Sequence, residues 1–329
     1  MPPAPGLTLV TGATGLVGHH IAAELLRRGR AVRCLVRDLE RARAVVPDGA
    51  ELARGDVTDQ DSVRAAMAGC AVVYHAAGLP EQWLRDVSTF DRVNRGGTEV
   101  VGEAALAAGV DRFVFTSTID VFRGGPGERY DESMLDPDPK GTHYERSKQA
   151  ADRWVAAAVE RGLPAVFLHP AAVYGPGPAA SPGTNQFLLD LSRGKVPALL
   201  PGGMPLVFAP DVGLGHVLAE RSPVGARYIL ADRYYTMQDI AALVRHACGS
   251  KIPRTLPRWL ARVVSAIGEM LARLTRRPPL LPRGQLHFLL WGAQPSSDHA
   301  QKDLGWHPTP LAQGLAALLA AARAPDQMA

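Results

Sequence analysis

The chain opens with short apolar runs that alternate with stretches whose apolar residues recur every three or four positions. Residues 7–10 form the first apolar run, and Ile21, Leu25 and Leu26 follow at helical spacing after a glycine-containing turn. The alternation continues to residue 168. It predicts strands at 7–10, 31–36, 50–54, 71–75, 112–116 and 165–168, and helices after the turn and at 39–46, 61–67, 90–108 and 143–160.

Strands that alternate with helices predict an α/β fold, in which right-handed crossovers build a doubly wound parallel sheet. We therefore expect a Rossmann-type dinucleotide-binding domain over residues 1–168. Residues 169–329 are expected to form a smaller C-terminal substrate-binding lobe, interleaved with the first domain. The 329 residues, 47% of them hydrophobic, are enough for a large core of this kind.

Three glycines, Gly12, Gly15 and Gly18, lie between the first predicted strand and the first predicted helix. In a doubly wound sheet the ligand binds beyond the carboxyl ends of the strands, where this turn falls. One glycine permits the tight turn, one lets backbone approach a pyrophosphate at the helix N-terminus, and one lets the helix pack closely on the strand. The placement therefore predicts a dinucleotide cofactor.

The end of the second predicted strand bears on which nicotinamide dinucleotide is bound. A carboxylate there would bind the ribose 2′-hydroxyl of NAD, whereas an arginine would bind the 2′-phosphate of NADP. The strand ends at Val36 and is followed by Arg37, with Arg33 on the same alternating face. We expect NADP(H), with Arg37 as the phosphate ligand, and Asp38 keeps NAD(H) as the alternative.

Tyr144 and Lys148 are four residues apart, which places a phenol and an ammonium on one face of the predicted helix 143–160. A phenol with a pKa of about 10 is a poor acid or base at neutral pH, but a nearby cation stabilises the phenolate. We therefore expect Lys148 to lower the pKa of Tyr144. Many helices have this spacing by chance, so the pair gains its meaning from the glycine turn upstream.

Charge and cysteine content narrow the classes of function. The formal net charge is +4 and the basic residues form no long run with interleaved aromatics, so nucleic-acid binding is not expected. Cys34, Cys70 and Cys248 have no metal-ligand spacing, which predicts no metal site and fits a reducing cytoplasm. From the apolar segments we expect neither a signal peptide nor a membrane span.

Together these motifs resemble the extended short-chain dehydrogenase/reductase family over nearly the whole chain. The resemblance lies in the glycine turn, the segments 55–58, 74–78, 94–98, 115–118 and 169–177, and the Tyr144 and Lys148 pair. It implies a cofactor site, to which Arg37 is added, made of Gly12, Thr14, Gly15, Leu16, Val17, Arg37, Asp56, Val57, Ala76, Ala77, Gly78, Asn94, Thr116, Ser117, Tyr144, Lys148, Pro170, Ala171, Ala172 and Val173.

The same resemblance implies a catalytic triad of Thr118, Tyr144 and Lys148. Residues 113–121 look most like 3β-hydroxysteroid dehydrogenases and dihydroflavonol reductases. Two positions depart from the family pattern. His169 stands where the family usually has Arg. Asp120 follows Ile119, whereas sugar 4,6-dehydratases have an Asp-Glu pair after the Thr, so we interpret Asp120 as a solvated turn residue and disfavour dehydration.

Apolar residues in the segments expected near the triad favour a hydrophobic substrate. The candidate pocket residues are Trp83, Phe122, Tyr174, Phe187 and Phe208. The combined prediction is an NADP(H)-dependent oxidoreductase that interconverts a ketone and a secondary alcohol on a sterol-, polyketide- or aromatic-like molecule. Hydride transfer would be accompanied by proton transfer from or to Tyr144.

Two other functions stay open at this point. A nucleotide-sugar 4-epimerase uses the same triad with tightly bound NAD, and Arg123, Arg129 and Lys195 could bind the diphosphate of its substrate. A sensor or scaffold would bind the cofactor without catalysis, and the complete triad argues against it.

An apolar stripe at helical spacing, with arginines largely elsewhere, occupies residues 256–277, and a further apolar segment follows at 286–291. The commonest explanation of such a stripe is a helix packed on the protein's own core. The alternatives are a helix that covers a hydrophobic substrate or touches an anionic membrane surface. The family resemblance also makes a homodimer plausible, through the helices 90–108 and 143–160. The residues of the stripe are Leu260, Val263, Val264, Ile267, Leu271 and Leu274.

Overall fold

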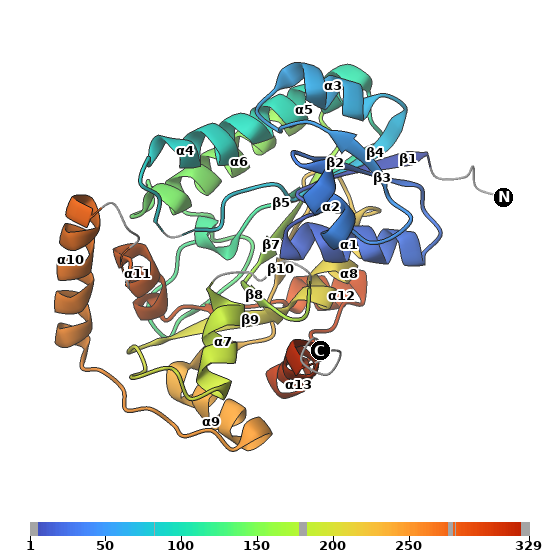
Figure 1. Cartoon of the computed structure of the whole chain (residues 1–329). Coiled ribbons are helices and arrows are strands. Elements are labelled where there is room, and N and C mark those ends of the chain that lie inside the picture. Colours follow the sequence, from blue (N-terminus) through green and yellow to red (C-terminus); the bar gives the residue numbers. More distant parts are fainter. Residues whose placement is uncertain (1–5, 82, 178–182, 276–278, 280, 324–329) are drawn as a thin grey trace.

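A computed structural model of the chain describes residues 6–81, 83–177, 183–275, 279 and 281–323. Its centre is a seven-stranded sheet in the order β10, β7, β5, β4, β1, β2, β3, and every neighbouring pair is parallel (Figure 1). The predicted Rossmann-type sheet is confirmed. Its strands are β1 (Leu7–Thr11), β2 (Val32–Val36), β3 (Glu51–Arg54), β4 (Cys70–His75), β5 (Arg112–Thr116), β7 (Ala165–Pro170) and β10 (Arg227–Leu230).

Helices cover both faces of this sheet because successive residues of a strand point to opposite sides. In β1, Val10 belongs to the apolar cluster that contains Ile21, whereas Leu9 belongs to the cluster that contains Val101. Figure 1 shows α3, α5 and α6 on one side of the sheet and α1 and α8 on the other. The helices are α1 (Leu16–Arg27), α2 (Leu39–Val45), α3 (Gln60–Met67), α5 (Gly97–Ala108), α6 (His143–Glu160) and α8 (Ala209–Ala219).

The helix predicted at 90–108 is divided in the structure. The short α4 (Ser88–Phe90) and a π-helical segment (Asp91–Gly96) precede α5. A π-helical turn is rare and is frequently found at functional sites. Here it positions Asn94, one of the predicted cofactor residues.

The second lobe is built around a three-stranded sheet in the order β11, β9, β8, which are Tyr234–Thr236, Gly203–Phe208 and Ala172–Tyr174. The helices α7 (Thr184–Ser192), α9 (Met237–Cys248) and α13 (Leu311–Arg323) pack on it. The chain after residue 168 also supplies β10 and α8 to the first sheet. The two parts therefore interleave in space.

The remaining elements are short strands, a 3₁₀ turn and three helices near the C-terminus. The two-residue strands β6 (Arg129–Tyr130) and β12 (Gln294–Pro295) pair in parallel, and the 3₁₀ turn η2 (Ile119–Val121) follows β5. Near the C-terminus lie α10 (Arg258–Thr275), α11 (Arg283–Trp291) and α12 (Asp298–Leu304). Within the described ranges, no helix has the length and apolar content needed to cross a membrane.

Candidate active site

The glycine turn after β1 has the shape that a diphosphate site needs. Gly12 has a φ of +74°, and a Cβ there would lie 2.7 Å from the backbone of Ala76 and Ala77 at the end of β4. A Cβ on Gly18 would lie 2.3 Å from the carbonyl oxygen of Gly12. Gly15 caps α1 without a side-chain hydrogen bond, so backbone N–H groups at the start of α1 are available to an anion.

A buried chain of hydrogen bonds leads away from this turn. His75 Nδ1 lies 2.8 Å from Thr11 Oγ1, and His75 Nε2 lies 3.0 Å from Thr98 Oγ1. Thr98 donates its hydroxyl hydrogen to the carbonyl oxygen of Asn94, so its oxygen accepts from His75 Nε2. Burial lowers the pKa of His75 to about 3, and its neutral ring bridges the two threonines in one defined tautomer.

Asn94 continues the hydrogen-bond chain to α6, which carries Tyr144 and Lys148. Its Oδ1 accepts from the backbone N–H of Leu79 at 2.7 Å, and its Nδ2 donates to Ser147 Oγ at 2.9 Å. Ser147 in turn donates to the carbonyl oxygen of Tyr144 at 2.7 Å. The loop after β4 and the first turns of α6 are therefore held together through a single buried amide.

The start of α6 is fixed by a capping box. Thr142 Oγ1 accepts from the N–H of Glu145, and the Glu145 carboxylate accepts from the N–H of Thr142 at 2.8 Å. Two turns along, Lys148 Nζ donates to the carbonyl oxygen of Thr116, the last residue of β5, at 2.9 Å. Lys148 is thus held at the carboxyl end of β5, one helical turn after Tyr144.

The pKa values of this pair differ from the expected direction. Burial raises the pKa of the Tyr144 hydroxyl, the charge of Asp120 adds to the effect, and a hydrogen bond with Thr118 opposes it. Burial lowers the pKa of Lys148 to about 8, against the attraction of Asp152 and Asp120. In the protein alone, burial therefore sets the direction of the Tyr144 pKa, and the lowering of this pKa by Lys148 stays a prediction.

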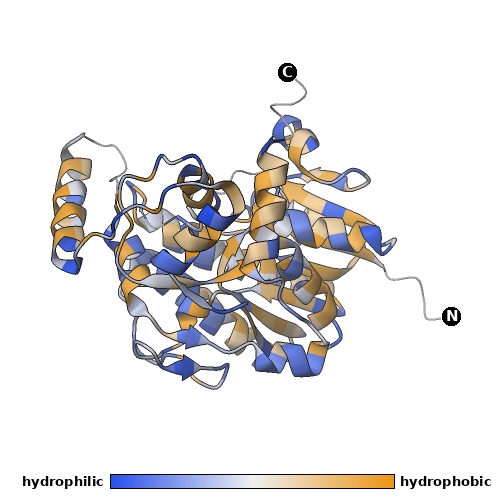
Figure 2. Ribbon diagram, turned by 90° about the horizontal axis from the view of Figure 1, so that it is seen from below, coloured by the Kyte–Doolittle hydropathy of each residue, from blue (hydrophilic) through white to orange (hydrophobic). Residues whose placement is uncertain are grey.

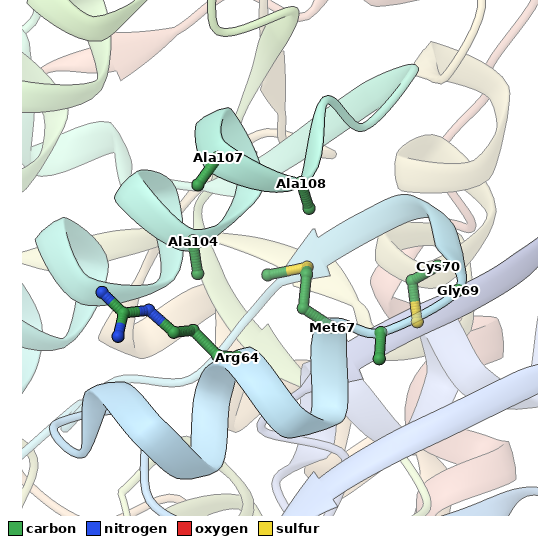
Figure 3. A pocket seen from close by; sticks show the side chains of 8 residues that line it. Arg64, Met67, Gly69, Cys70, Ala104, Ala107 and Ala108 are labelled. Atoms are coloured by element: carbon green, nitrogen blue, oxygen red, sulfur yellow. The ribbon is translucent and has the colours of Figure 1, made fainter.

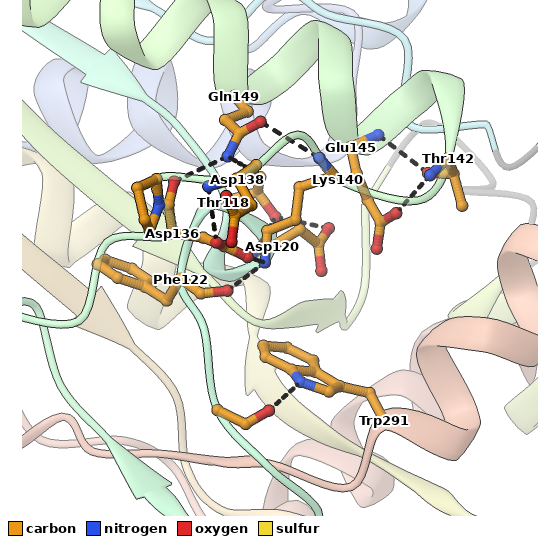
Figure 4. Close-up of polar contacts among 12 residues, drawn as sticks. Thr118, Asp120, Phe122, Asp136, Asp138, Lys140, Thr142, Glu145, Gln149 and Trp291 are labelled. Carbon is orange, nitrogen blue, oxygen red and sulfur yellow. Dashed lines mark hydrogen bonds and ion pairs between the residues drawn. The ribbon is translucent and has the colours of Figure 1, made fainter.

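Asp120 is the largest correction at this site. The sequence suggested a solvated turn residue, yet Asp120 is only 7% exposed and lies in the turn η2 (Figure 4). Thr118 Oγ1 donates to Asp120 Oδ2 at 3.0 Å, and the N–H of Asp120 donates back to Thr118 Oγ1 at 3.3 Å. The side chain turns inward because Thr118 caps η2 and directs the turn back toward α6.

Other charges surround Asp120 from several elements. Its Oδ1 has no hydrogen-bond partner among the described residues. Burial and the charge of Glu145 raise the pKa of Asp120 to about 7, while Thr118, Lys140 and Lys148 oppose the shift. Lys140 donates to the carbonyl oxygen of Phe122 and forms an ion pair with Asp136 at 2.7 Å. Asp120 can therefore exchange a proton near neutral pH.

A second buried cluster lies behind Thr118. Ser117 Oγ donates to Asp152 Oδ2 at 2.6 Å, and Arg227 donates to the same carboxylate at 2.9 Å. His169 Nδ1 lies 3.2 Å from the carbonyl oxygen of Thr118, and burial lowers the pKa of His169 to about 3. Ser117, expected beside the cofactor, thus has its hydroxyl committed to Asp152.

Sequence reasoning missed Glu145, Asp152 and Arg227. The Thr-x-x-Glu spacing at 142–145 is a capping-box signal for Glu145, and Asp152 lies one helical turn after Lys148. Arg227 has no such signal, because it reaches the cluster from β10, 75 residues along the chain from Asp152.

The residues expected at the adenosine end lie after β2 and β3. Arg37 is exposed and forms no hydrogen bond or ion pair with the described residues, whereas Asp38 Oδ1 accepts from the N–H of Arg41 and caps α2. Arg33 pairs with Glu51 at 2.8 Å instead of pointing to a ligand. Asp56 Oδ1 accepts from the N–H and hydroxyl of Thr58.

The other predicted cofactor residues lie along the carboxyl edge of the sheet. Leu16, Pro170 and Ala171 are buried, and Gly78 is exposed. Val57 lies against Gly97, where a Cβ would come within 2.9 Å of its side chain. The partly exposed members are Thr14, Val17, Ala76, Ala77, Ala172 and Val173.

Comparison with known proteins places this chain in a family. A sequence model of the NAD dependent epimerase/dehydratase family matches residues 8–227. The chain belongs to this family. The resemblance to extended short-chain dehydrogenases/reductases is confirmed, and the chain is an NAD(P)-dependent oxidoreductase of that type. Relatives named as a putative dihydroflavonol 4-reductase and a 3 beta-hydroxysteroid dehydrogenase/isomerase agree with the predicted branch.

Three similar proteins cover nearly all of the chain. "Sterol demethylase protein B" of Methylococcus capsulatus is 30% identical over 92% of this chain and 94% of the relative. The "4-hydroxy-2-methyl-3-oxo-4-farnesyl-3,4-dihydroquinoline-1-oxide ketoreductase" of Stigmatella aurantiaca is 32% identical over 91% of each chain. The crystal structure of gox2253 has a TM-score of 0.82 and 32% identity, covering 98% of this chain and 99% of the other.

In this epimerase/dehydratase family member, the predicted substrate residues fall into two groups. Trp83, Phe187 and Phe208 are partly exposed. Phe122 and Tyr174 are fully buried, Phe122 with its ring centroid 4.7 Å from that of His169 and Tyr174 against Phe208. These two residues therefore offer no exposed surface to a substrate in this structure and belong to the core.

A hollow in the surface of the protein lies far from these residues. It has a volume of about 330 Å³ and lies between α3 and α5, with Arg64, Met67 and Cys70 on one side and Ala104 and Ala108 on the other (Figure 3). Cys70 begins β4, so the hollow is at the amino end of a strand whose carboxyl end bears the site. Its position separates it from the chemistry described above.

Proposed function

We propose that this chain is an NADP(H)-dependent oxidoreductase that interconverts a ketone and a secondary alcohol on a largely hydrophobic small molecule. The observation that carries the proposal is the position of Thr118 beside the carboxyl end of β5, where it contacts Asp120 and where Lys148, one helical turn after Tyr144, donates to the carbonyl oxygen of Thr116. It gathers one hydroxyl that can hold a substrate oxygen and two groups that can exchange a proton.

The residues at the glycine turn fit a dinucleotide. Gly15 leaves backbone N–H groups at the start of α1 for a pyrophosphate, and a Cβ on Gly78 would lie 4.0 Å from Nζ of Lys148, which donates to the carbonyl oxygen at the end of β5. When bound, the nicotinamide supplies or accepts the hydride, and its oxidised form adds a positive charge that favours the Tyr144 phenolate. Arg37, exposed and without a partner among the described residues, is suited to a 2′-phosphate. The Asp38 carboxylate is already used at the start of α2, which favours NADP over NAD.

During reduction, the Tyr144 hydroxyl delivers its proton to the carbonyl oxygen of the substrate, and Thr118 holds that oxygen. Asp120 controls how Thr118 holds the substrate oxygen. When Asp120 is ionised it accepts the Thr118 hydrogen, and when it is protonated it can donate to Thr118 Oγ1 and free that hydrogen for the substrate. The buried amide of Asn94 keeps α6, and with it Tyr144, in register with the loop after β4.

The hydrophobic substrate class is supported by the relatives named as acting on sterol-like and farnesylated compounds. A nucleotide-sugar diphosphate would need unpaired cations. Of the three considered, Arg129 pairs with Asp298 at 3.2 Å and donates to Ser296, while Arg123 and Lys195 are exposed to solvent. Arg123 and Lys195 keep a diphosphate possible, but the epimerase alternative has less support because relatives are named as reductases and dehydrogenases.

The direct test measures oxidation of NADPH and NADH against a panel of hydrophobic ketones, with the purified protein also examined for bound nucleotide. The proposal expects turnover with NADPH and a preference for it that Arg37→Ser reduces by about tenfold or more. An enzyme that copurifies with tightly bound NAD, reduces no ketone of the panel and interconverts nucleotide sugars would be an epimerase instead.

A further inference from the structure

The helix α10 exposes one of its apolar faces to solvent. Trp259 is 66% exposed and Met270 57%, and Val263, Ile267 and Leu271 are exposed by 45% to 49%. Their spacing of three or four residues places them on one face of the helix. The expectation that this stripe packs on the protein's own core is therefore wrong for Val263, Ile267 and Leu271.

The opposite face of α10 holds the helix to the protein. Ala261, Ser265 and Ala272 are buried, and Ala261 packs with Leu281 and Leu286. Arg283 of α11 pairs with Glu269 of α10 at 3.2 Å. The exposed face is thus presented by a helix that is docked along its other side.

The position of α10 leaves this face accessible. Figure 1 shows α10 at the edge of the molecule, with only α11 between it and the rest of the chain. Figure 2, turned by 90°, again shows the helix standing apart at one side, with apolar positions along its length. Because the two views agree, no described element covers the exposed face.

The charged residues around this face are almost all positive. From residue 251 to residue 283 the sequence has eight Lys or Arg residues and one acidic residue, Glu269. That acid is already paired with Arg283. Arg258 and Arg262 are exposed on the helix itself, and Lys251 and Arg254 are exposed just before it.

We propose that the exposed face of α10 docks on the surface of an anionic lipid bilayer, with the helix lying in the plane of the membrane. The apolar side chains would enter the boundary between headgroups and acyl chains, and the arginines would contact lipid phosphates. Trp259 at the start of the helix is suited to the headgroup level. An acidic protein partner would match the charge but not a continuous row of apolar side chains, so the bilayer fits both features.

The docking surface lies close to the candidate active site. Across α10, a cleft of about 500 Å³ is lined by Arg262, Ser265, Leu286 and Leu290, and the buried hydroxyl of Ser265 has no hydrogen-bond partner among the described residues. On the far side of α11, His287 Nε2 lies 3.8 Å from Glu145, next to Tyr144. Only α11 therefore lies between α10, which carries the docking face, and the candidate active site. The proposal itself does not rest on the proposed reaction.

The test is sedimentation of the full chain with vesicles, one set of phosphatidylcholine alone and one with phosphatidylglycerol added. We expect binding to the anionic vesicles to be at least tenfold stronger and to fall with added salt. Ile267→Asn combined with Leu271→Asn should reduce binding by about tenfold or more. Arg258→Gln combined with Arg262→Gln should reduce it by about tenfold to thirtyfold on anionic vesicles only.

A matched control is available in Val224, which is 51% exposed on a turn outside α10. Val224→Asn should leave vesicle binding unchanged, and unaltered melting curves would show that every variant is folded. A wild-type protein that stays in the supernatant, or variants that bind as well as wild type, would overturn the proposal. So would a concentration-dependent dimer in sedimentation velocity that the Ile267 and Leu271 variant abolishes, because the face would then be a self-association surface.

Discussion

Charged side chains are usually exposed and large apolar side chains are usually buried, and two regions of this molecule depart from that rule. One is the surroundings of Asp120, and the other is the exposed face of α10. At Asp120, a carboxylate is buried beside Glu145 with one oxygen unpartnered among the described residues. On α10, an indole and four aliphatic or thioether side chains face solvent. Each arrangement costs free energy if stability alone is considered.

The difference between the two regions indicates what each is built to meet. The carboxylate is held by the Thr118 hydroxyl, and in the proposed function its raised pKa adjusts proton exchange at the site. The helix has no such internal partner on its exposed face, and only an external apolar phase would relieve its exposure. We therefore relate one region to the proposed chemistry inside the protein and the other to the proposed membrane surface outside it.

The largest expected effect is that of Tyr144→Phe. Removing the hydroxyl should lower the rate of ketone reduction by about 10² to 10⁴ while NADPH binding is kept, because only the proton donor is lost. Steady-state rates together with NADPH titration by fluorescence would measure this. Tyr130→Phe is the matched control, since it also removes a buried hydroxyl near Asp120. Equal losses in the two variants would remove the special role of Tyr144.

The second expected effect concerns the glycine turn after β1, where the diphosphate of the cofactor is expected to bind. In Gly12→Ala the new Cβ would meet the backbone of Ala76 at 2.7 Å in a strained φ of +74°, which should cost about 3 kcal/mol and abolish NADPH binding. Gly29→Ala has the same positive φ but nothing within 4 Å, so only about 1 kcal/mol should be lost. Thermal melting and NADPH titration would separate the two. Similar behaviour of both variants would contradict the packing argument.

Asp120→Asn should stabilise the protein above neutral pH. Because the folded-state pKa of Asp120 is raised to about 7, the folded chain holds a proton that the unfolded chain has lost between about pH 4 and pH 7. The stability of the wild type therefore falls as the pH rises through this window. The variant should gain on the order of 2–4 kcal/mol above pH 7 and little near pH 4.

Urea unfolding at several pH values measures the stability gain, and the pH profile of reduction should lose its inflection near pH 7. Asp138→Asn, at an exposed carboxylate, should change stability by no more than about 0.5 kcal/mol. If Asp120→Asn is less stable than the wild type at high pH, the ionised Asp120 carboxylate must be stabilised by its surroundings in the native protein, and the prediction is contradicted.

The smallest expected effect is on the exposed helix. Ile267→Asn should change the free energy of unfolding by no more than about 0.5 kcal/mol, because the side chain is already in water. Leu289→Ala, at a buried position of the neighbouring α11, should cost about 2–5 kcal/mol. Urea denaturation without lipid is the measurement. A large loss for Ile267 would mean that its face is covered in solution.

The sequence was sufficient to predict the parts of the molecule that local pattern controls. Strand and helix periodicity predicted β5 and α6 with their observed bounds, and the glycine turn was placed correctly. The spacing of Tyr144 and Lys148 predicted the face that they share. Each of these rests on neighbours within a few positions in the chain.

What depends on distant contacts was not predictable. Asp120 turns inward because Thr118 caps η2 and the turn packs against α6, and no pattern around residue 120 indicates this. Arg227 reaches Asp152 from another strand of the sheet. The apolar stripe of α10 could be seen in the sequence. Amphipathic spacing alone does not say which apolar residues pack on the core, and Ile267 of the stripe is exposed.

The most direct test of the central claim follows the hydride itself. The wild-type protein and Tyr144→Phe would be given NADPH deuterated at nicotinamide C4 and a hydrophobic ketone, and the alcohol would be analysed by mass spectrometry. The account predicts deuterium on the carbinol carbon, from one face of the nicotinamide, and little product with the variant. Product without deuterium, or equal product from both proteins, would contradict it.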